Sequence, residues 1–328
     1  MRSEALYLGL DVGSVSTNVV VINEAGKLLA KKYLRTQGQP IKAIREGLSA
    51  IGSSFDNAQI KGVGTTGSGR RLAGIIVGAD VVKNEITAHA VATSMSVPGV
   101  KTVLEIGGQD SKIILLENGV IRDFAMNTVC AAGTGSFLDQ QAARLGIPIS
   151  EFGALALKAK APVRIAGRCT VFAESDMIHK QQTGHSIEDI IAGLCDAMVR
   201  NYLNSVGKGK DLRPVIAFQG GVAANIGMRY AFERALGQEV VVPEHFDVMG
   251  ALGAALLAKE EVRKTQTRTR FRVFDAVEHR YESRSFECQD CANACEVVVV
   301  LMDGDPVATW GSKCGKWEST KQELPIAR

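Results

Sequence analysis

Short apolar runs alternate along the chain with segments in which apolar residues recur every three or four positions. The runs are typical of buried β-strands, and the three-to-four spacing predicts amphipathic helices. The clearest helices are expected at residues 41–51, 87–95 and 187–203. Strands that alternate with helices indicate an α/β fold.

The start of the chain follows the same order of elements as its middle. A strand at residues 6–11 leads through Gly13 to a hairpin, and a strand at 103–106 leads through Gly107 to another hairpin. This recurrence predicts two similar halves that face each other across a cleft. The expected division is residues 1–98 for the first half, 99–262 for the second half and 263–328 for a basic linker and cysteine-rich tail.

The composition agrees with a soluble chain of more than one domain. Its 328 residues exceed what one hydrophobic core usually serves, and 46% of them are hydrophobic against 22% charged. The net charge of +3 is too small to indicate nucleic-acid or membrane binding, and no stretch approaches the ~20 apolar residues of a membrane span. Seven cysteines without a secretion signal predict metal or redox chemistry in the cytoplasm rather than a disulfide framework.

Three junctions between a strand and a turn carry residues suited to a nucleotide. Asp11 ends the first strand, where a carboxylate can hold hydrated Mg²⁺ while the small residues after it offer N–H and hydroxyl groups to phosphate. Asp110 follows the second strand in the same way, and Gly220 with Gly221 would let the backbone lie flat against a nucleoside. The other candidates in these turns are Gly13, Ser14, Ser16, Thr17, Gly107, Gly108, Gln109 and Val222.

Two cysteines stand at expected helix starts. Cys130 lies before a helix expected from about residue 136, and Cys169 lies before Thr170, a candidate N-cap. The positive end of a helix dipole favours an anion, and the same field favours a thiolate that can bind a metal. The alternative is a buried structural cysteine, which is the interpretation that best fits Cys195. The turn after Cys130 contains Gly133, Thr134 and Gly135, which are further candidates to bind phosphate.

These turns resemble the phosphate, adenosine and late-helix motifs of the duplicated, ribonuclease H-like α/β fold shared by actin, heat-shock ATPases and hexokinase-like sugar kinases. The motifs are DVGS at 11–14, GGQD at 107–110, GGV at 220–222 and GALG at 250–253. The runs NTVCAAGTG at 127–135 and CTVFAES at 169–175 resemble more closely the ATP-dependent activators of 2-hydroxyacyl-CoA dehydratases. That BadF/BadG/BcrA/BcrD-type family includes components of benzoyl-CoA reductase and the reductase of double-cubane cluster proteins. The resemblance covers roughly residues 5–260 and departs at Glu105, where aspartate is expected.

The resemblance implies an ATPase that drives low-potential electron transfer. Two subunits of such activators share one [4Fe–4S] cluster, so Cys130 and Cys169 of each chain in a homodimer would be its ligands. ATP or ADP would bind with Mg²⁺ organised by Asp11 and Asp110, and Gln109 would orient the attacking water. The implied partners are an acceptor iron–sulfur enzyme, either a 2-hydroxyacyl-CoA dehydratase or a double-cubane cluster protein, and ferredoxin or flavodoxin as electron donor.

The last segment of the chain lies outside this resemblance. Its spacing C-x₂-C-x₃-C, followed by one more cysteine, would form a closed tetrahedral site of four thiolates. Zn²⁺ and a second [4Fe–4S] cluster both fit such a site. The alternative is a set of reduced thiols in a flexible tail. The basic run before the cysteines is expected to be a solvated linker rather than a nucleic-acid site. The four cysteines are Cys288, Cys291, Cys295 and Cys314.

Two other functions fit the same fold. A small-molecule kinase needs a base on a substrate hydroxyl, but no sugar-binding signature is evident, and a kinase has no use for cysteines at helix N-termini. A non-catalytic, ATP-dependent scaffold or sensor is the third interpretation.

Overall fold

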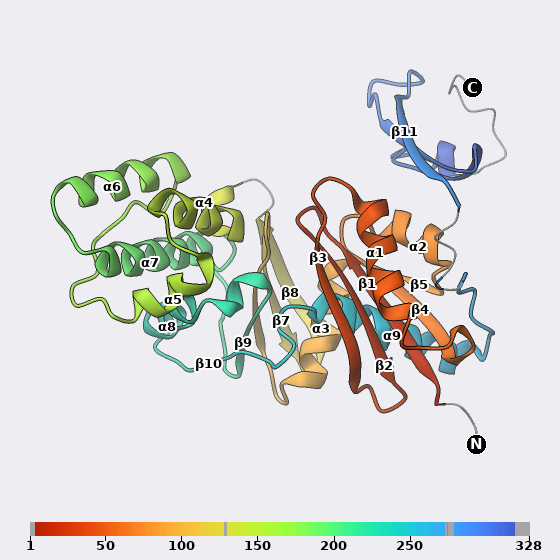
Figure 1. Ribbon diagram of the computed structural model, residues 1–328, viewed down its shortest axis with the longest axis horizontal. Helices are drawn as coiled ribbons and strands as arrows, with labels where there is room; N and C mark the ends of the chain where they lie inside the picture. Colours follow the sequence, from red (N-terminus) through yellow and green to blue (C-terminus); the bar gives the residue numbers. More distant parts are fainter. Residues whose placement is uncertain (1–3, 128–129, 273, 275–278, 319–328) are drawn as a thin grey trace. The chain divides into compact units, whose positions relative to one another are not determined.

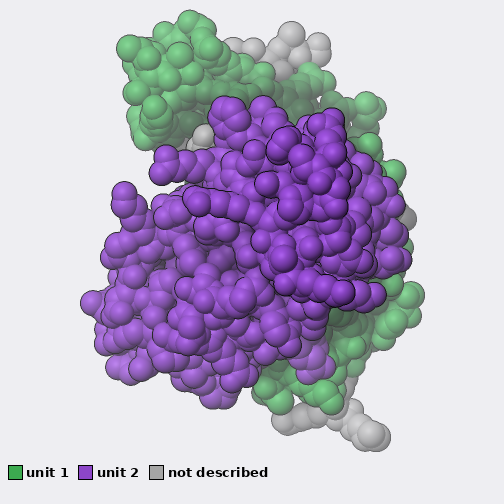
Figure 2. Space-filling view, turned by 90° about the vertical axis from the view of Figure 1, so that its left-hand side faces the viewer, with its two compact units in different colours: residues 1–13, 17–83, 254–328 green, residues 14–16, 84–253 purple. Residues whose placement is uncertain are grey.

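A computed structural model describes residues 4–127, 130–272, 274 and 279–318 of the chain (Figure 1). The chain divides into two compact units, which Figure 2 shows in different colours. Unit 1 consists of residues 1–13, 17–83 and 254–328, and unit 2 consists of residues 14–16 and 84–253. Among the described residues, no helix combines the length and the apolar character that a membrane crossing requires.

A five-stranded mixed sheet forms the centre of unit 1. Its strand order is β3-β2-β1-β4-β5, with β1 antiparallel to β2 and parallel to β4. Every residue of β1 is buried except Asp11, which is half-buried near the end of the strand. The strands are β1 (Leu6–Val12), β2 (Ser16–Asn23), β3 (Leu28–Arg35), β4 (Ile60–Thr66) and β5 (Val81–Val82), and the helices are α1 (Pro40–Gly52), α2 (Arg70–Val77) and the short η1 (Asn57–Gln59).

The sheet of unit 2 repeats this topology. Its order is β10-β9-β6-β7-β8, with β6 antiparallel to β7 and parallel to β9, so β6 corresponds to β1 and β9 to β4. The prediction of two similar α/β halves is therefore confirmed. The strands are β6 (Thr102–Ile106), β7 (Ser111–Glu117), β8 (Val120–Asn127), β9 (Ile216–Gln219) and β10 (Val240–Val241).

Helix α7 is the most central helix of unit 2, and many of its residues are buried (Figure 1). Its Tyr202 meets Phe232 of α8 edge to face, with the ring centroids 5.3 Å apart, and Phe232 lies 5.0 Å from Phe218 of β9. This row of aromatic rings packs α7 and α8 against the sheet. The helix predicted at 187–203 is confirmed by α7. The elements are α3 (Glu85–Ser96), η2 (Ala131–Gly133), α4 (Gly135–Leu145), α5 (Ile149–Ala156), α6 (Thr170–Gln182), α7 (Ile187–Ser205), η3 (Gly221–Ala224) and α8 (Ile226–Leu236).

Helix α9 (Met249–Thr265) requires small residues where it packs against its neighbours. A Cβ on Gly253 would lie 1.9 Å from the carbonyl oxygen of Ala88 in α3. A Cβ on Gly64 of β4 would lie 2.0 Å from the carbonyl oxygen of Ala254. The small residues seen in the sequence at this helix start are therefore needed for close packing.

The tail contains a sheet that the sequence analysis did not predict. The strands β11 (Tyr281–Glu287), β12 (Glu296–Met302) and β13 (Asp305–Trp310) pair antiparallel in that order, and the short η5 (Lys316–Glu318) follows. The available signals were the apolar run of β12 and the turn at Asp303 and Gly304, which have φ angles of +54° and +95°. The alternative of a flexible tail is wrong for these strands.

Part of the basic segment before this sheet is docked rather than a solvated linker. The main-chain N–H of Arg272 donates to the carbonyl of Val77 at 3.0 Å. The N–H of Arg270 and the hydroxyl of Thr269 both donate to the carboxylate of Asp80, at 2.9 and 2.7 Å. Asp80 therefore fastens this segment to the end of α2.

Replacement of Asp80 by alanine should lower the free energy of unfolding by about 1–3 kcal/mol. The N–H groups of Arg270 and Val63 would both lose their acceptor, since the same carboxylate also binds Val63 at 2.9 Å. Urea denaturation followed by circular dichroism measures the change. The control is Glu46→Ala, which removes an exposed carboxylate 3.9 Å from Lys42 and should cost less than about 1 kcal/mol. Equal costs for the two variants would contradict the role of Asp80.

Candidate functional site

The first predicted phosphate turn joins β1 to β2. Gly67 packs directly against Asp11, because a Cβ on this glycine would lie 2.6 Å from Asp11 Oδ1. The φ angle of Gly67 is +92°, so both its conformation and its surroundings require glycine. The hydroxyl of Thr36 donates to the carbonyl of Gly13 at 2.9 Å and lies 3.0 Å from the hydroxyl of the buried Thr17. The hydroxyl of Thr17 thus already has a hydrogen-bond partner, and Asp11 lies where β1 leads into the turn.

The second predicted phosphate turn, between β6 and β7, is bonded to the start of α4. The N–H of Gly135 donates to the carbonyl of Gly107 at 2.8 Å, and the N–H of Ser136 donates to that of Gly108 at 2.9 Å. The turn is closed by a hydrogen bond of 3.0 Å from Gly107 N to Asp110 O. The structure therefore brings together two segments that the sequence analysis assigned separately to phosphate.

Residues 14–16 belong to unit 2 and contact the turn between β6 and β7. A Cβ on Gly108 would lie 2.6 Å from the Cβ of Val15, so only glycine fits here. Ser14 and Gln109 are exposed, and Ser16 is half-buried. The two serines and Gln109 thus belong to turns that contact each other within one unit.

The glycine-flanked turn after Cys130 is tightly packed. Thr134 is buried, and its hydroxyl donates to the carbonyl of Ala131 at 2.7 Å. A Cβ on Gly133 would lie 2.9 Å from Oδ1 of Asn201 in α7. The N–H groups of Thr134, Gly135 and Ser136 also donate to main-chain carbonyls, so the phosphate role of this turn stays a prediction.

A buried lysine forms ion pairs with three carboxylates beside the second turn. Lys112 Nζ lies 2.8 Å from Glu85 Oε2 of α3 and 3.0 Å from Glu105 Oε2 of β6. The third carboxylate is that of Asp110, whose Oδ1 is 2.9 Å away. The hydroxyl of Tyr202 donates to the main-chain carbonyl of the same lysine at 2.6 Å. Lys112 therefore joins α3, β6, α7 and the turn, although sequence analysis did not single it out.

The charges in this cluster do not balance. Burial alone would lower the pKa of Lys112, but the three carboxylates raise it above the usual value for lysine. Burial raises the pKa of Glu105, and the ammonium offsets only part of that effect. Since one ammonium faces three carboxylates, the charged form is disfavoured at Glu105, which is 4% exposed. Glu105 thus pairs with Lys112, at the position where an aspartate was expected.

The third predicted turn follows β9 and rests on a buried polar network. Gly220 has a φ angle of +88°, and a Cβ there would lie 2.4 Å from the carbonyl oxygen of Ile106. Burial, followed by the charge of Lys112, lowers the pKa of His89 to about 3, so its neutral ring accepts a hydrogen bond from Gln219 Nε2 at 2.8 Å. The next residues, Gly221 and Val222, lie in η3.

Cys130 and Cys169 each occupy the N-cap position of a helix. Cys130 precedes η2 and Cys169 precedes α6, so Thr170, the expected N-cap, is instead the first residue of α6. Both side chains are half-buried free thiols. The Sγ of Cys130 lies 3.9 Å from the carbonyl oxygen of Arg168, so the two cysteine segments are neighbours. Residues 128–129 of the first motif lie outside the described residues.

Side-chain amides hold the backbone beside both cysteines. Asn127 accepts a hydrogen bond from Cys130 N at 3.0 Å and donates one to Cys130 O at 2.9 Å. Asn201 Nδ2 donates to the carbonyl of Gly167 at 2.6 Å, two residues before Cys169. These contacts fix the main chain and use neither thiol. Asn201 lies far from both cysteines in sequence, so only the fold reveals its role.

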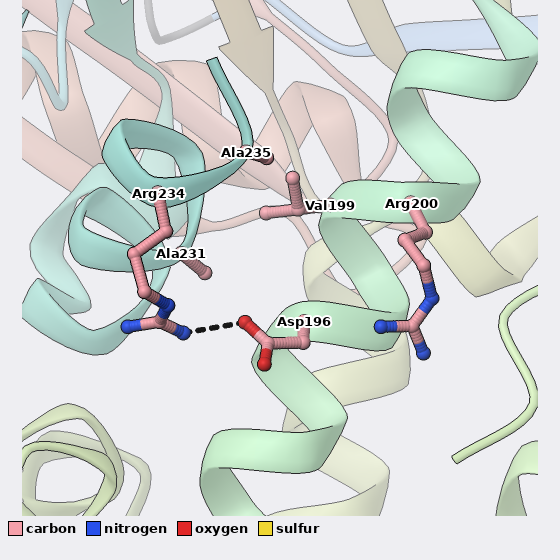
Figure 3. A pocket seen from close by; sticks show the side chains of 6 residues that line it. All are labelled: Asp196, Val199, Arg200, Ala231, Arg234 and Ala235. Atoms are coloured by element: carbon pink, nitrogen blue, oxygen red, sulfur yellow. Dashed lines mark hydrogen bonds and ion pairs between the residues drawn. The ribbon is translucent and has the colours of Figure 1, made fainter. Parts of the chain in front are cut away.

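A hollow of about 220 Å³ lies between α7 and α8 (Figure 3). Asp196 lies between two arginines and forms an ion pair of 2.5 Å with Arg234. The other arginine, Arg200, donates to the carbonyl of Ile165 at 2.7 Å and so supports the segment before Cys169. None of the predicted site residues is among the residues that line this hollow.

The tail cysteines lie on two loops at one end of the β11–β13 sheet. Cys288 directly follows β11 and Cys295 directly precedes β12, and Cys288 N donates to Cys295 O at 2.8 Å. Cys291 and Cys314 are exposed. Within the part of the chain that the structure describes, no three histidine, cysteine, aspartate or glutamate side chains are grouped to hold a metal ion. The tail metal site therefore stays a prediction.

Replacement of Lys112 by methionine should lower the free energy of unfolding by about 3–5 kcal/mol, because it leaves buried carboxylates without a counter-ion. Chemical denaturation measures the loss. Lys42→Met is the matched control, since Lys42 forms only an exposed ion pair of 3.9 Å with Glu46 and its loss should cost about 0.3–0.5 kcal/mol. A Lys112 variant as stable as the control would show that the buried cluster contributes little.

Comparison with known proteins agrees with this geometry. A family model described as the BadF/BadG/BcrA/BcrD ATPase family matches residues 8–258. The (R)-2-hydroxyglutaryl-CoA dehydratase activating ATPase of Acidaminococcus fermentans is 38% identical over 78% of this chain and 98% of its own length. The activator of lactoyl-CoA dehydratase of Anaerotignum propionicum is 34% identical over 78% of this chain and 98% of its own.

A solved structure extends the match to three dimensions. The activator of the 2-hydroxyisocaproyl-CoA dehydratase from Clostridium difficile, with bound ADPNP, has a TM-score of 0.72 and is 32% identical over 80% of this chain and 97% of that one. The expected fold class, a duplicated ATPase fold, is confirmed. The β11–β13 sheet lies beyond the matched residues 8–258. From its sequence, its fold and its turns, the chain belongs to the BadF/BadG/BcrA/BcrD ATPase family.

Proposed function

We propose that this protein is an ATP-hydrolysing activator that delivers low-potential electrons from a [4Fe–4S] cluster, shared by two copies of the chain, to a partner iron–sulfur enzyme. The observation that carries this proposal is the pair of hydrogen bonds from Gly135 and Ser136 to the carbonyls of Gly107 and Gly108. These bonds fasten the segment that begins at Cys130 to the GGQD turn. A nucleotide-dependent change in that turn would thus reach a cluster ligand through a few main-chain atoms.

The nucleotide part of the proposal rests on the turns and on one relative. The solved activator with bound ADPNP supports ATP as the ligand of this chain. Asp11 and Asp110 would organise Mg²⁺, and the exposed Gln109 would orient the attacking water. The turn at residues 133–135, bonded to the GGQD turn through Gly135, would lie beside the bound phosphate. ATP hydrolysis would supply the free energy for an electron transfer that otherwise runs uphill.

The cysteine pair fits a cluster shared between two chains. Cys130 and Cys169 lie on neighbouring segments, and their thiols are half-buried with the adjacent backbone already held. A [4Fe–4S] cluster takes four thiolates and supplies a one-electron carrier, so a second copy of the chain would provide the other two ligands. Val171 and Phe172, beside Cys169, are 67% and 66% exposed. Such apolar side chains support a surface that a second copy would cover.

The names of the relatives favour an acceptor enzyme over a small substrate. The matched activators serve dehydratases of three different acyl-CoA compounds. We therefore infer that the acceptor is a 2-hydroxyacyl-CoA dehydratase or a double-cubane cluster protein, with ferredoxin or flavodoxin as donor. The small-molecule kinase is less supported, because the relatives at 38% and 34% identity are named as activators of dehydratases and a kinase would have no use for the two N-cap cysteines.

Cys130→Ala should remove the iron of the shared cluster, about two atoms per chain, from protein purified anaerobically and should weaken the dimer, because two of the four cluster ligands in a dimer would be lost. Iron analysis and sedimentation velocity measure the two effects. Cys195→Ala is the control: Cys195 is 1% exposed in the core of unit 2, and this variant should keep its iron. Equal loss of iron from the two variants would sink the assignment of the cluster ligands.

Nucleotide should change the exposure of the cluster, because the cysteine segment is bonded to the GGQD turn. The rate at which a chelator removes iron is expected to differ by about 5-fold or more between ATP and ADP, the lower end of typical allosteric coupling. Asp11→Asn should weaken Mg²⁺-dependent hydrolysis while the cluster stays assembled. The same chelation rate with ATP, with ADP and without nucleotide would show that the cluster is not linked to hydrolysis.

A further inference from the structure

The first loop of the tail sheet places three cysteines close together in the chain and closes on itself. Cys288 and Cys295 stand at the two ends of the β11–β12 connection, which the hydrogen bond of 2.8 Å between Cys288 N and Cys295 O closes at its base. Inside the loop, Ala294 N donates to Cys291 O at 3.1 Å. The loop is therefore a folded turn that holds three thiols near the end of one hairpin.

The second loop, which follows β13 and carries Cys314, is fastened to the first one. Lys316 forms an ion pair with Asp290, which lies between Cys288 and Cys291. The indole N–H of Trp317 donates to the Sγ of Cys288 at 3.2 Å. Two side chains that follow Cys314 thus contact the loop that carries the other three cysteines.

The path of the second loop is also fixed at its start. Gly311 has a φ angle of +111°, and a Cβ there would lie 2.3 Å from the carbonyl oxygen of Glu296. Glu296 directly follows Cys295, so the two loops lie at the same end of the sheet. The N–H of Trp317 also donates to Ser312 Oγ at 3.2 Å, which folds the second loop back on itself.

The Cys288 thiol has both a carboxylate and hydrogen-bonding or cationic groups around it: its Sγ donates to Asp290 Oδ2 at 3.2 Å, and that carboxylate is paired with Lys316. Trp317 offers an N–H donor to one sulfur, and the ammonium of Lys316 lies 5.0 Å from the centre of the same indole ring. Hydrogen-bond donors and cations around bound thiolates are typical of metal sites, where they stabilise the charge on sulfur. A small apolar core would require neither group.

The size of the module points the same way. At its cysteine end the buried apolar side chains are Cys288, Val297 and Trp317, with Phe286 and Cys295 partly buried beside them. The other end of the sheet shares the hydrophobic core of unit 1 through Tyr281 and Val300, so only the cysteine end depends on so small a core. A core of that size usually needs a metal or disulfides to hold its fold. All four tail cysteines are free thiols, so no disulfide fills that role.

We propose that Cys288, Cys291, Cys295 and Cys314 together bind one metal centre through four thiolates, as either Zn²⁺ or a [4Fe–4S] cluster. Binding would release the thiol protons to solvent and draw the four sulfurs together between the two loops. This proposal does not rest on the proposed function. It involves neither Cys130 nor Cys169, and it concerns residues beyond the matched segment 8–258.

The test uses the full chain with Cys130→Ala and Cys169→Ala, so that metal at the shared cluster does not contribute. Purified anaerobically, this variant should contain either one zinc ion or four iron atoms per chain, and the metal found distinguishes the two forms. Adding Cys291→Ser and Cys314→Ser should abolish that metal. Both of these side chains are exposed, so the serines should not disturb packing. Adding Cys195→Ala instead is the control and should leave the metal in place.

A second measurement does not depend on the serine variants. Co²⁺ added to the metal-free Cys130→Ala, Cys169→Ala chain should give the visible absorption of tetrahedral cobalt bound to thiolates, and it should saturate at one ion per chain. Added Zn²⁺ should displace it. A chain that contains no metal and gives no thiolate absorption with Co²⁺ would overturn the proposal, as would metal that persists after the serine substitutions. Neither result bears on iron bound by Cys130 and Cys169 in the unaltered chain.

Discussion

One lysine ammonium organises the part of unit 2 on which the proposed chemistry depends. Lys112 is 2% exposed, yet it lies within 3.0 Å of carboxylates on a helix, a strand and a turn. A buried charge of this kind is tolerated only when it is paired, and removing it would leave an excess of negative charge in the core. The cluster therefore fixes the start of α3 and the GGQD turn with respect to the sheet.

The same lysine limits what Asp110 can do. Its Oδ1 is 2.9 Å from the ammonium, so a Mg²⁺ ion at this oxygen would compete with Lys112. Glu85 would remain to balance the lysine, so the cluster could release Asp110 without leaving a bare buried charge. A turn held by an exchangeable ion pair, and bonded through Gly107 and Gly108 to the start of α4, can respond to a bound cation.

The duplicated fold could be predicted from the sequence because it depends on local signals. Apolar runs that end in glycine turns specify the strands of both sheets, and the three-to-four spacing specifies α1 and α7. The Lys112 cluster could not be predicted: Glu105 faces the lysine across two adjacent strands, but Glu85 of α3 and Tyr202 of α7 reach it only through the packing of distant elements. The β11–β13 sheet could not be predicted with the same ease, because β12 is its one apolar run and its neighbour β11 is mostly polar and exposed.

Cys130 and Cys169 could not be assigned as metal ligands from their spacing in the sequence alone. Cys130 and Cys169 lie 39 positions apart (169 minus 130) in the sequence. A cluster shared by two chains would take two ligands from each chain, so its four ligands would not appear together in one sequence motif. What separates them from Cys195 is their surroundings. Burial raises the pKa of Cys195 to about 12, so it remains a thiol in an apolar core. At Cys130 and Cys169 the polar side chains instead bind the adjacent backbone and leave each sulfur half-buried at a helix start, as the proposed cluster would require.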